Sequence, residues 1–552
     1  MRNHLIAIIL LLFLSFWAIR PILASGFFPM HDDTQVSRVI VMGKALRLGQ
    51  FPVRWVSDLG YGYGYPIFNF YGPLPYYIGG IFYAAGVDAL IATKIMFILG
   101  IVLAGVGMYV LTQEIVGISG GILAALLYIY APYHAVEIYV RGAVGEFWVL
   151  VFLPLIILGL WHSFIDKKRY APLIGGLGLA GVIVSHTILG YITTFFLISF
   201  FILYWSIAIL RRKLDRSLLF SHIFLLIIGL GVSASFWLPA FFEMQFTNVA
   251  AQIGGAANFH DHFICISQLW DSPWGYGGSS PGCIDGFSLK LGKIHILLAL
   301  ASVSVFFLKG IRIRSVRFLI TTGISSVLFS LFFALPVSES IWSIIPFFAY
   351  VQYPWRFLTF TIFGLSLMGG TLLFFLPKVF RWFLFFIIIL GIIYFNGKLF
   401  IPQYIYQRSA QAFESEEDLR FRVSKISDEY LPPQITRPES VKDIVGDTLP
   451  QTPNVVIDTD IDTDTYSKFI VTAQNDQSLL VRRAYFPGWE YWVNGKKMIP
   501  MIEHGLPRIT VPMGRSVVEF WFRNTPIRTL ANAISIIIVV VLFFIYGKKT
   551  II

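Results

Sequence analysis

"LIAIILLLFLSFWAIRPILASGFFPMHDDTQVSRV", residues 5–39, begins as an almost uninterrupted apolar run and ends with two adjacent carboxylates before a polar stretch. An apolar run of about twenty residues is long enough to cross a bilayer as a helix. Such runs recur along most of the 552-residue chain, which is 56% hydrophobic and only 13% charged, with a mean hydropathy of +0.72. A soluble protein of this length would carry more charge. The sequence therefore predicts a multi-span membrane protein.

Twelve apolar runs define the expected fold class, a membrane all-α module of about twelve transmembrane helices. The first run has the length of a signal peptide, but Arg20 near its end and the many later runs favour a retained anchor. The expected spans are 4–24, 91–112, 118–133, 146–165, 171–189, 191–210, 219–240, 293–309, 317–336, 357–377, 382–400 and 528–546.

Basic residues indicate how the module is oriented. Five basic segments fall on one side of the predicted arrangement, namely 166–169, 211–216, 309–317, 378–381 and 548–549. Cytoplasmic loops collect Lys and Arg, so this side and both termini are expected in the cytoplasm, with the protein in the cytoplasmic membrane. The formal net charge of +11 is explained by this orientation, and no nucleic-acid partner is expected.

The predicted spans divide the chain into three parts. Residues 1–400 form a polytopic module with long outer loops at 25–90 and 241–292. Residues 401–527 comprise a linker and a small extracytoplasmic β-sandwich domain. Residues 528–552 are the final transmembrane helix and a cytoplasmic tail.

The β-sandwich is predicted from alternation. Runs such as "SKFIVTA" and "SVVEFWF" alternate apolar and polar residues with the period of a half-buried strand. Asn494-Gly495 is the strongest short hairpin signal, so the runs on either side of it are expected to pair.

The acidic run "IDTDIDTDT" has the spacing of a calcium loop at Asp458, Asp460 and Asp462. Position six of that loop is Thr463 where glycine is needed, and position twelve is Phe469 where glutamate is needed. A strand with acidic residues on a solvated face is the favoured interpretation.

The paired carboxylates follow the first span directly. Residues 34–51 have a helical apolar period, which Gly49 and Pro52 end, so Asp32 or Asp33 could cap a helix there. One aspartate is enough for that role, and the second is unexplained. An anion such as a lipid phosphate would also be favoured at this helix end.

Several charged residues lie near the predicted outer boundary, where they are unusual. The basic ones are Arg54, Arg141, Lys290, Lys293 and Arg356. Arginine pairs bidentately with phosphate, although a long side chain at a boundary also snorkels to headgroups. Glu137 and Glu146 share a short loop with Arg141, which would otherwise be a solvated connector. His186, near a span end, is more often satisfied by a neighbour than catalytic.

Long motifs resemble one family, the 6-pyruvoyl-tetrahydropterin-synthase-related membrane proteins. Two are "HDDTQVSRVIVMGKALRLGQFPVRW" and "GYGYPIFNFYGPLPYY"; others are "QLWDSPWGYGGSSPGCIDGFSLKLGKIH", "VQYPWRF" and "DEYLPPQ". The ending "YFPGWEYWVNGKK" with "ITVPMGRSVVEFWFRNTP" is similar to the membrane-proximal β-domain of this group. A pterin synthase needs a three-histidine zinc site, and no such cluster is visible in the sequence.

The resemblance implies instead the C-type glycosyltransferase-like superfamily. Its members have many spans, an acidic residue in the first outer loop and a polyprenyl-phosphate-linked sugar donor. It implies that Asp32 or Asp33 acts as general base on the acceptor hydroxyl. Arg356, with Arg54 or Arg141, would hold the leaving phosphate. The two aspartates could instead hold Mg²⁺ or Mn²⁺, and no cofactor is firmly implied.

The loop "DSPWGYGGSSPG" would cover such a site. Trp270, Trp274 and Tyr276 could stack on a sugar, or the loop could be an ordered lid that does not touch substrate. Cys265 and Cys283 flank it on the oxidising side, where a disulfide could close it. The residues assigned to substrate binding are His31, Arg54, Glu137, Arg141, Trp270, Trp274, Tyr276 and Arg356.

The expected function is transfer of a sugar from a polyprenyl-phosphate-linked donor to a glycan, lipid or protein acceptor on the outer face. Membrane lipids are the other expected partners. One alternative is a lipid or polysaccharide transporter, although the sequence has no convincing internal repeat. A second is a non-catalytic scaffold for envelope assembly, which would tolerate substitution of Asp32 and Asp33.

Overall fold

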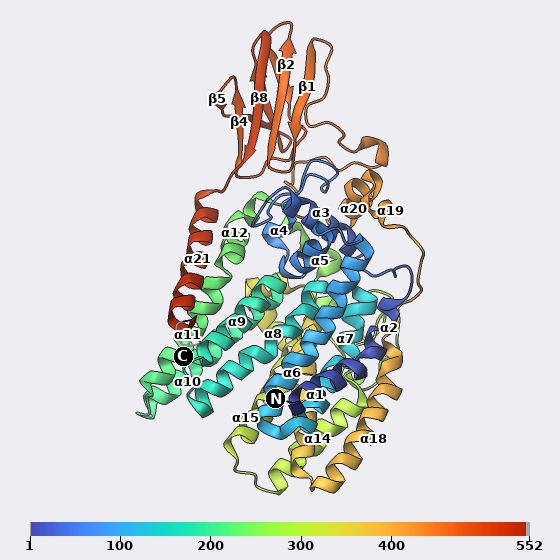
Figure 1. The fold of residues 1–552 in the computed structure, drawn as a ribbon, viewed down its shortest axis with the longest axis vertical. Coiled ribbons are helices and arrows are strands. Elements are labelled where there is room, and N and C mark those ends of the chain that lie inside the picture. Colours follow the sequence, from blue (N-terminus) through green and yellow to red (C-terminus); the bar gives the residue numbers. More distant parts are fainter. Residues whose placement is uncertain (1, 548–552) are drawn as a thin grey trace.

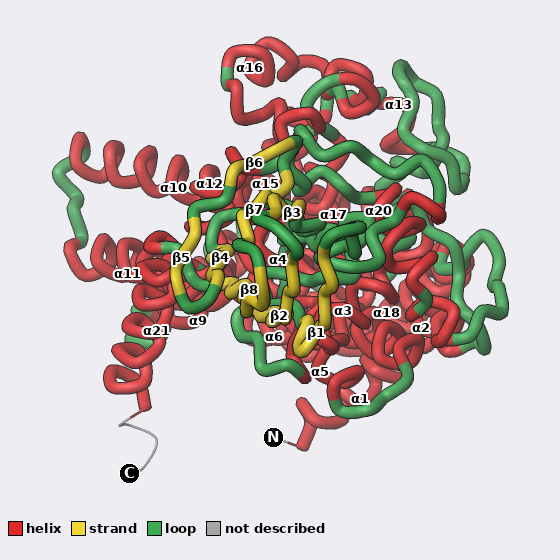
Figure 2. Tube along the Cα trace, turned by 90° about the horizontal axis from the view of Figure 1, so that it is seen from above, coloured by secondary structure: helices red, strands yellow, loops and turns green. Residues whose placement is uncertain are grey.

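The computed structural model describes residues 2–547, which form a helical bundle with a β domain projecting from one end (Figure 1). Seen from above that end, the strands lie over the helices (Figure 2). Two elements lie away from the β domain: the first helix, α1 (Arg2–Leu14), and the C-terminal end of the last helix, α21 (Pro526–Tyr546).

Helices occupy all twelve predicted apolar ranges. Among the described residues, seven helices are long and apolar enough to cross a membrane, or nine when each of two bent pairs counts as a span; two more apolar helices are shorter. The predicted multi-span helical module is confirmed. Its helices are α1, α2 (Phe16–Leu23), α6 (Ala89–Ile129), α8 (Val144–Trp161), α9 (Ala171–Ser185), α10 (Thr187–Leu210), α11 (Arg216–Val232), α12 (Ala234–Glu243), α14 (Lys293–Leu308), α15 (Arg314–Ala334), α17 (Leu358–Thr371), α18 (Lys378–Asn396) and α21.

Helix α6 accounts for two predicted spans because it is a hairpin. Gly117 has a φ of 78°, a left-handed value that breaks the helix. A Cβ added to Gly121 would lie 2.8 Å from Cβ of Gln113. A Cβ added to Gly105 would likewise meet the side chain of Ile129. Residues 105 and 129 would be about 36 Å apart in a straight helix. The chain therefore folds back at Gly117.

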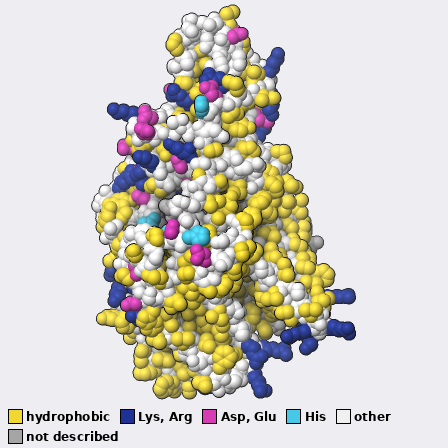
Figure 3. Space-filling model, turned by 180° about the vertical axis from the view of Figure 1, so that it is seen from behind, with side chains coloured by type: hydrophobic (Ala, Val, Ile, Leu, Met, Phe, Trp, Pro, Cys, Tyr) yellow, Lys and Arg dark blue, Asp and Glu magenta, His cyan; other side chains and the backbone are white. Residues whose placement is uncertain are grey.

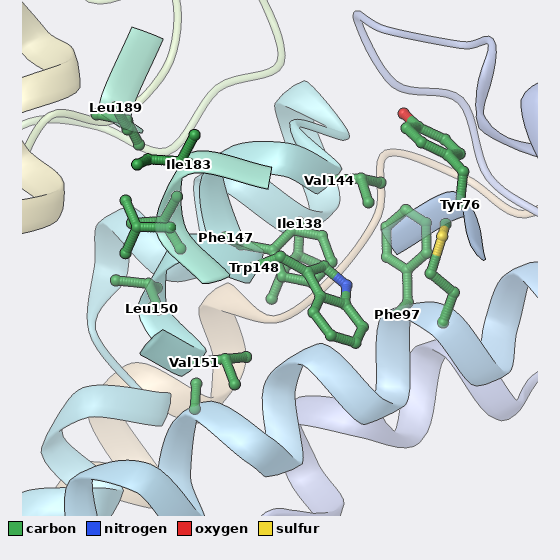
Figure 4. Close-up of a cluster of buried hydrophobic side chains, with 14 of the residues drawn as sticks. Tyr76, Phe97, Ile138, Val144, Phe147, Trp148, Leu150, Val151, Ile183 and Leu189 are labelled. Carbon is green, nitrogen blue, oxygen red and sulfur yellow. The ribbon is translucent and has the colours of Figure 1, made fainter. Parts of the chain in front are cut away.

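Apolar side chains from neighbouring helices lock the start of α8 in place (Figure 4). Phe147 and Trp148 of α8 are buried, and the ring of Phe147 lies 5.4 Å from that of Phe97 in α6. Ile183 of α9 and Leu189 of α10 close the other side of the cluster. This packing fixes the first turn of α8, which carries Glu146.

Three helices cap the bundle on the β-domain side: α3 (Gln35–Arg47), α4 (Ile67–Phe70) and α5 (Leu74–Ala84). The helix predicted after the paired aspartates is α3. Its N-cap is Thr34, and no side chain accepts a capping hydrogen bond there, so neither Asp32 nor Asp33 caps α3. The capping interpretation is therefore wrong, and both carboxylates need another explanation.

Segments of the linker cover α3. They include α19 (Ala410–Glu414), a short helical stretch at 417–422 and α20 (Val423–Ile426). Ser37 Oγ of α3 donates to Asp418 Oδ2 at 3.1 Å, and Asp418 also pairs with Arg408 and Arg422. Helix α3 is consequently buried on nearly all sides, where the sequence pattern predicted a single buried face.

The β domain consists of two antiparallel sheets that precede the last helix. The first has the order β1-β2-β8-β4-β5, and the second has the order β3-β7-β6. The predicted hairpin is present, since Asn494 and Gly495 have positive φ and connect β4 to β5. The strands are β1 (Val455–Asp462), β2 (Tyr466–Ala473), β3 (Gln477–Leu480), β4 (Trp489–Val493), β5 (Lys496–Met498), β6 (Met501–Glu503), β7 (Leu506–Val511) and β8 (Gly514–Phe522).

The acidic run lies on the exposed face of β1, as the strand interpretation predicts. Lys468 Nζ lies 2.7 Å from Asp460 Oδ2, and Arg483 Nη2 lies 2.8 Å from Asp462 Oδ1. These two carboxylates are thus matched by cations of the same domain.

The molecular surface separates apolar from charged regions (Figure 3). Hydrophobic side chains dominate the bundle, and Lys and Arg side chains project at the end opposite the β domain. Basic residues 211–213, between α10 and α11, are exposed there. The apolar belt is the surface expected of a protein embedded in lipid.

Candidate active site in the cavity at Asp32

A cavity of about 880 Å³ lies where the loop after α2 meets the α9–α10 junction. Its lining contains both polar and apolar side chains. The polar lining includes Asp32, Arg38, Tyr71, Glu146, His186, Gln352, Arg356 and Glu429. The apolar lining includes Ile183, Ile188, Leu230, Phe236, Trp237, Phe241, Met244, Ile253 and Phe347. Such a cavity suits an amphiphilic ligand.

The two adjacent aspartates have different surroundings. Asp32 lines the cavity, and its carboxylate makes no hydrogen bond or ion pair with the part of the chain that the structure describes. Asp33 is not on the cavity wall, and its Oδ2 lies 3.0 Å from Nη1 of Arg422. The pair therefore does not provide two metal ligands at one site, which was the arrangement left open for Mg²⁺ or Mn²⁺.

Backbone hydrogen bonds position Asp32. The N–H groups of His31 and Asp32 donate to the carbonyls of Val140 and Arg141, at 3.0 and 2.9 Å. Gln35 Nε2 donates to the carbonyl oxygens of Asp32 and Gly142, at 3.0 and 2.8 Å. The loop is thereby clamped to the segment before α8, and the Asp32 side chain is left to face the cavity.

Asp32 has the electrostatics of a proton acceptor. Burial raises the pKa of Asp32 above its ordinary value of 3.8, while Arg141 and Arg38 act in the opposite direction. A carboxylate without a partner and with a raised pKa binds a proton more readily than a solvated one. This combination fits general-base chemistry.

Glu146 lies between two arginines beside Asp32. Arg141 binds it bidentately, with Nη1 and Nη2 at 2.6 and 2.7 Å from the carboxylate oxygens. Arg356 Nε donates to Glu146 Oε1 at 3.0 Å, and its Nη1 donates to the carbonyl of Val351 at 2.6 Å. Nη2 of Arg356 has no hydrogen-bond partner within residues 2–547. Two arginines thus pair with one carboxylate in this cluster.

His186 adds a directed donor to this group. It is the N-cap of α10, and its Nδ1 accepts from the backbone N–H of Leu189 at 3.1 Å. A neutral imidazole then carries its proton on Nε2, which lies 3.9 Å from Glu146 Oε1. A Cβ at Gly145 would stand 2.7 Å from the carbonyl oxygen of Ser185, so glycine permits this approach.

Another part of the polar lining comes from α3 and the linker. Arg38 lies over the ring of Tyr71 at 4.3 Å, and its Nη2 donates to Ser427 Oγ at 3.1 Å. Ser427 in turn donates to Glu429 at 3.2 Å. Burial raises the pKa of Glu429 and also that of Tyr71. This part of the lining could form hydrogen bonds to the hydroxyls of a sugar.

The disulfide loop contacts the site from the side of His31. The structure joins Cys265 to Cys283, with Cα atoms 5.6 Å apart. His31 Nε2 lies 3.0 Å from the carbonyl oxygen of Tyr276, and Trp355 Nε1 donates to Ser279 Oγ at 3.2 Å. The loop thus packs over His31 and Trp355.

Several residues predicted to bind substrate are not on the cavity wall. Trp270, Trp274 and Tyr276 do not line it, and Trp270 instead lies 5.5 Å from Nζ of Lys293. Glu137 is buried and accepts from Thr359 Oγ1 at 3.1 Å.

Arg54 belongs to another cluster, between the bundle and the β domain. Its Nη1 donates to Asn69 at 2.8 Å, and its Nη2 donates to the carbonyl of Ser235 at 2.9 Å. Burial and the nearby Arg528 lower the pKa of Arg54 to about 10. This arrangement indicates a structural role.

The sequence patterns did not indicate that Arg38, Glu429 and Tyr430 line the cavity, and they did not place His186 and Glu146 there either. Nothing in the motif "DEYLPPQ" indicates that the linker folds back over α3. His186 had one usable signal, because its position before a long apolar helix is that of an N-cap.

A family model covers part of this site. Residues 68–252, about a third of the chain, match the model described as 6-pyruvoyl-tetrahydropterin synthase related domain; membrane protein. The resemblance seen in the motifs is confirmed over this range, which supplies Tyr71, Glu146 and His186 to the cavity. A further relative is an uncharacterised protein of Lactococcus lactis subsp. cremoris (strain MG1363), 27% identical over 244 residues, 42% of this chain and 38% of the relative.

Three solved structures are distantly similar to this chain. Arabinofuranosyltransferase AftD from Mycobacteria has a TM-score of 0.46 at 15% identity, covering 74% of this chain and 27% of its own. The oligosaccharyltransferase of Archaeoglobus fulgidus tethered with an acceptor peptide has a TM-score of 0.41 at 16% identity, covering 80% and 60%. ArnT from Cupriavidus metallidurans bound to undecaprenyl phosphate has a TM-score of 0.38 at 12% identity, covering 69% and 62%. The chain thus spans less than two thirds of each of these proteins.

Proposed function

We propose that this protein is a membrane glycosyltransferase that uses a polyprenyl-phosphate-linked sugar at the outer face of the cytoplasmic membrane. The observation that carries the proposal is the Asp32 carboxylate, which faces the cavity without a partner, close to Glu146 and its two arginines. The motif resemblance supports the same activity. The basic segments at the end away from the β domain support an orientation with that domain outside.

The cavity can accommodate both parts of such a donor. The apolar wall formed by α10, α11 and α12 would hold the first isoprene units. Arg356 Nη2 and His186 Nε2 would contact the phosphate. The wall with Arg38 and Glu429 would face the sugar.

The reaction would be a single displacement at the anomeric carbon. The acceptor oxygen forms a bond to that carbon while the bond to the phosphate oxygen breaks with its electron pair. Asp32 takes the acceptor proton, and Arg356 and His186 stabilise the charge on the leaving polyprenyl phosphate. Attack from the face opposite the phosphate inverts the anomeric centre.

Native mass spectrometry on purified protein with a panel of polyprenyl-phospho-hexoses tests the proposal. Wild type should bind at least one donor and release free polyprenyl phosphate. Asp32→Asn should keep binding and lose turnover by about 10²–10⁴-fold, the usual contribution of a general base.

Asp33→Asn is the matched control, because it removes the adjacent charge but leaves the cavity unchanged. Equal turnover in wild type and Asp32→Asn would contradict the base assignment. Donor binding without turnover in the wild type would favour a scaffold. Absence of binding for every donor would contradict the transferase itself.

A further inference from the structure

A second pocket lies at the opposite end of the bundle from the β domain. It measures about 420 Å³ and is formed where α9, α11 and α21 meet. Its polar rim contains Ser163, Lys167, Lys168, Arg169, Ser217 and Ser221. No carboxylate is among its described lining residues. It is separate from the Asp32 cavity and has no role in the proposed transfer reaction.

The cations of this rim are not equally available. Lys167 Nζ lies 2.8 Å from Asp215, and Lys168 Nζ lies 3.2 Å from Asp166. Arg169 makes no ion pair or side-chain hydrogen bond with the described part of the chain. Its backbone carbonyl accepts from Tyr546 Oη at 3.3 Å, so the residue is anchored while its guanidinium is free.

The floor of the pocket is apolar. It is formed by Phe220, Phe224, Ile227 and Ile228 of α11 and by Ile538, Val541, Leu542 and Ile545 of α21. Phe224 and Val541 are 47% and 43% exposed, so the floor continues into the surface that lipid would cover. A free phosphate would leave this apolar floor in contact with water.

Little of helix α21 is buried against the rest of the bundle. Ser535 Oγ donates to the carbonyl of Gly231 at 3.0 Å and accepts from Ser235 N–H at 2.9 Å, which joins α21 to the α11–α12 bend. Beyond Ile538 the remaining turns of α21 line the pocket, and only 6% of the apolar window of α21 is buried. A ligand here would fill the space between α21 and α11.

We propose that this pocket binds a phospholipid with an anionic headgroup. Arg169 would pair with the phosphodiester, helped by the serine hydroxyls, and one acyl chain would lie on the α11–α21 floor. The bound lipid would hold the C-terminal half of α21 against the bundle.

Lipid retention measured by native mass spectrometry tests this proposal. Delipidated protein would be offered phosphatidylglycerol, phosphatidylcholine with the same acyl chains, or glycerol phosphate as the free headgroup. Phosphatidylglycerol should be retained at least tenfold more than either of the others.

Two variants and a control distinguish lipid binding in the pocket from nonspecific electrostatic binding at the surface. Arg169→Ala should reduce phosphatidylglycerol retention about tenfold, because one charge-assisted contact is lost. Val541→Trp keeps every charge but fills the floor, and it should reduce retention similarly. Arg212→Ala removes one exposed cation outside the pocket and should leave retention unchanged. Equal retention of all lipids, or equal losses in Arg169→Ala and Arg212→Ala, would overturn the proposal.

Discussion

Two buried clusters in this protein have the same composition, one glutamate with two arginines, but different surroundings. Glu146 and Arg356 line the Asp32 cavity, and Arg141 pairs with Glu146. Glu243 lies at the joint between the bundle and the β domain, with Arg528 Nη2 2.9 Å away and Arg54 close by. The comparison teaches that access to a cavity, and not the set of residues, separates a candidate site from a structural joint.

Protein groups occupy both oxygens of the Glu243 carboxylate at the joint. Glu243 accepts from Asn69 Nδ2 at 2.9 Å and from Thr525 Oγ1 at 2.8 Å, and Arg528 is fully buried. At the other cluster, Nη2 of Arg356 and the carboxylate of Asp32 are left for a ligand. A buried charge that neighbours satisfy serves stability, and one left beside a cavity is available for binding.

The largest expected effect is on the joint. Glu243→Ala would leave Arg528 and Arg54 buried without their carboxylate, which should cost about 3–5 kcal/mol of unfolding free energy. Denaturant unfolding in detergent, followed by tryptophan fluorescence, would measure the loss. A cost below about 1 kcal/mol would show that the joint is not a structural anchor.

The next largest effect is on donor affinity, which should respond to a substitution in the Glu146 cluster but not to one in the Glu243 cluster. Arg356→Gln should weaken binding of a polyprenyl-phospho-sugar by roughly 10–100-fold, because a charge-assisted phosphate contact is lost. Arg54→Gln should lower stability and leave donor affinity per folded molecule unchanged. Titration of both variants with the same donor measures the two affinities. Equal losses of affinity would show that the two clusters do not differ in ligand binding.

A smaller effect concerns the pH dependence of stability. The pKa of Asp32 is raised in the folded protein, so the native state holds a proton that the unfolded chain loses from about 3.8 upward. Ionisation of Asp32 therefore costs stability as pH rises. Asp32→Asn should be more stable than wild type at pH 7, with the difference shrinking toward pH 4. A constant difference across this range would place Asp32 in a solvated environment.

The smallest expected effect is that of calcium on the β domain. Asp460 and Asp462 are already paired with Lys468 and Arg483, so added Ca²⁺ or a chelator should leave the melting temperature unchanged. Differential scanning calorimetry with each addition checks this. A calcium-dependent rise of several degrees would restore the loop interpretation.

Most of the fold follows from local patterns in the sequence. Apolar runs of bilayer length became helices, and alternation with Asn494-Gly495 became a β domain. The hairpin at Gly117 was also readable, because two spans were predicted on either side of it. These features depend on neighbouring residues, which a sequence displays directly.

The site was predictable only in part, because long-range contacts assemble it. The loop after the first helix indicated Asp32 but not which aspartate faces the cavity, since that depends on Arg422, nearly 400 residues away in the chain. Arg54 and Arg356 both looked like phosphate ligands near an outer boundary. Only tertiary structure shows that Arg54 belongs to the joint.

The most direct test of the account is a cryo-EM structure of Asp32→Asn with a bound polyprenyl-phospho-sugar, for which the variant should be inactive but competent to bind. Donor density is expected in the Asp32 cavity, with the phosphate at Arg356 and His186 and the prenyl chain along α10 to α12. The anomeric carbon should face residue 32. Density bound elsewhere, with this cavity empty, would contradict the account.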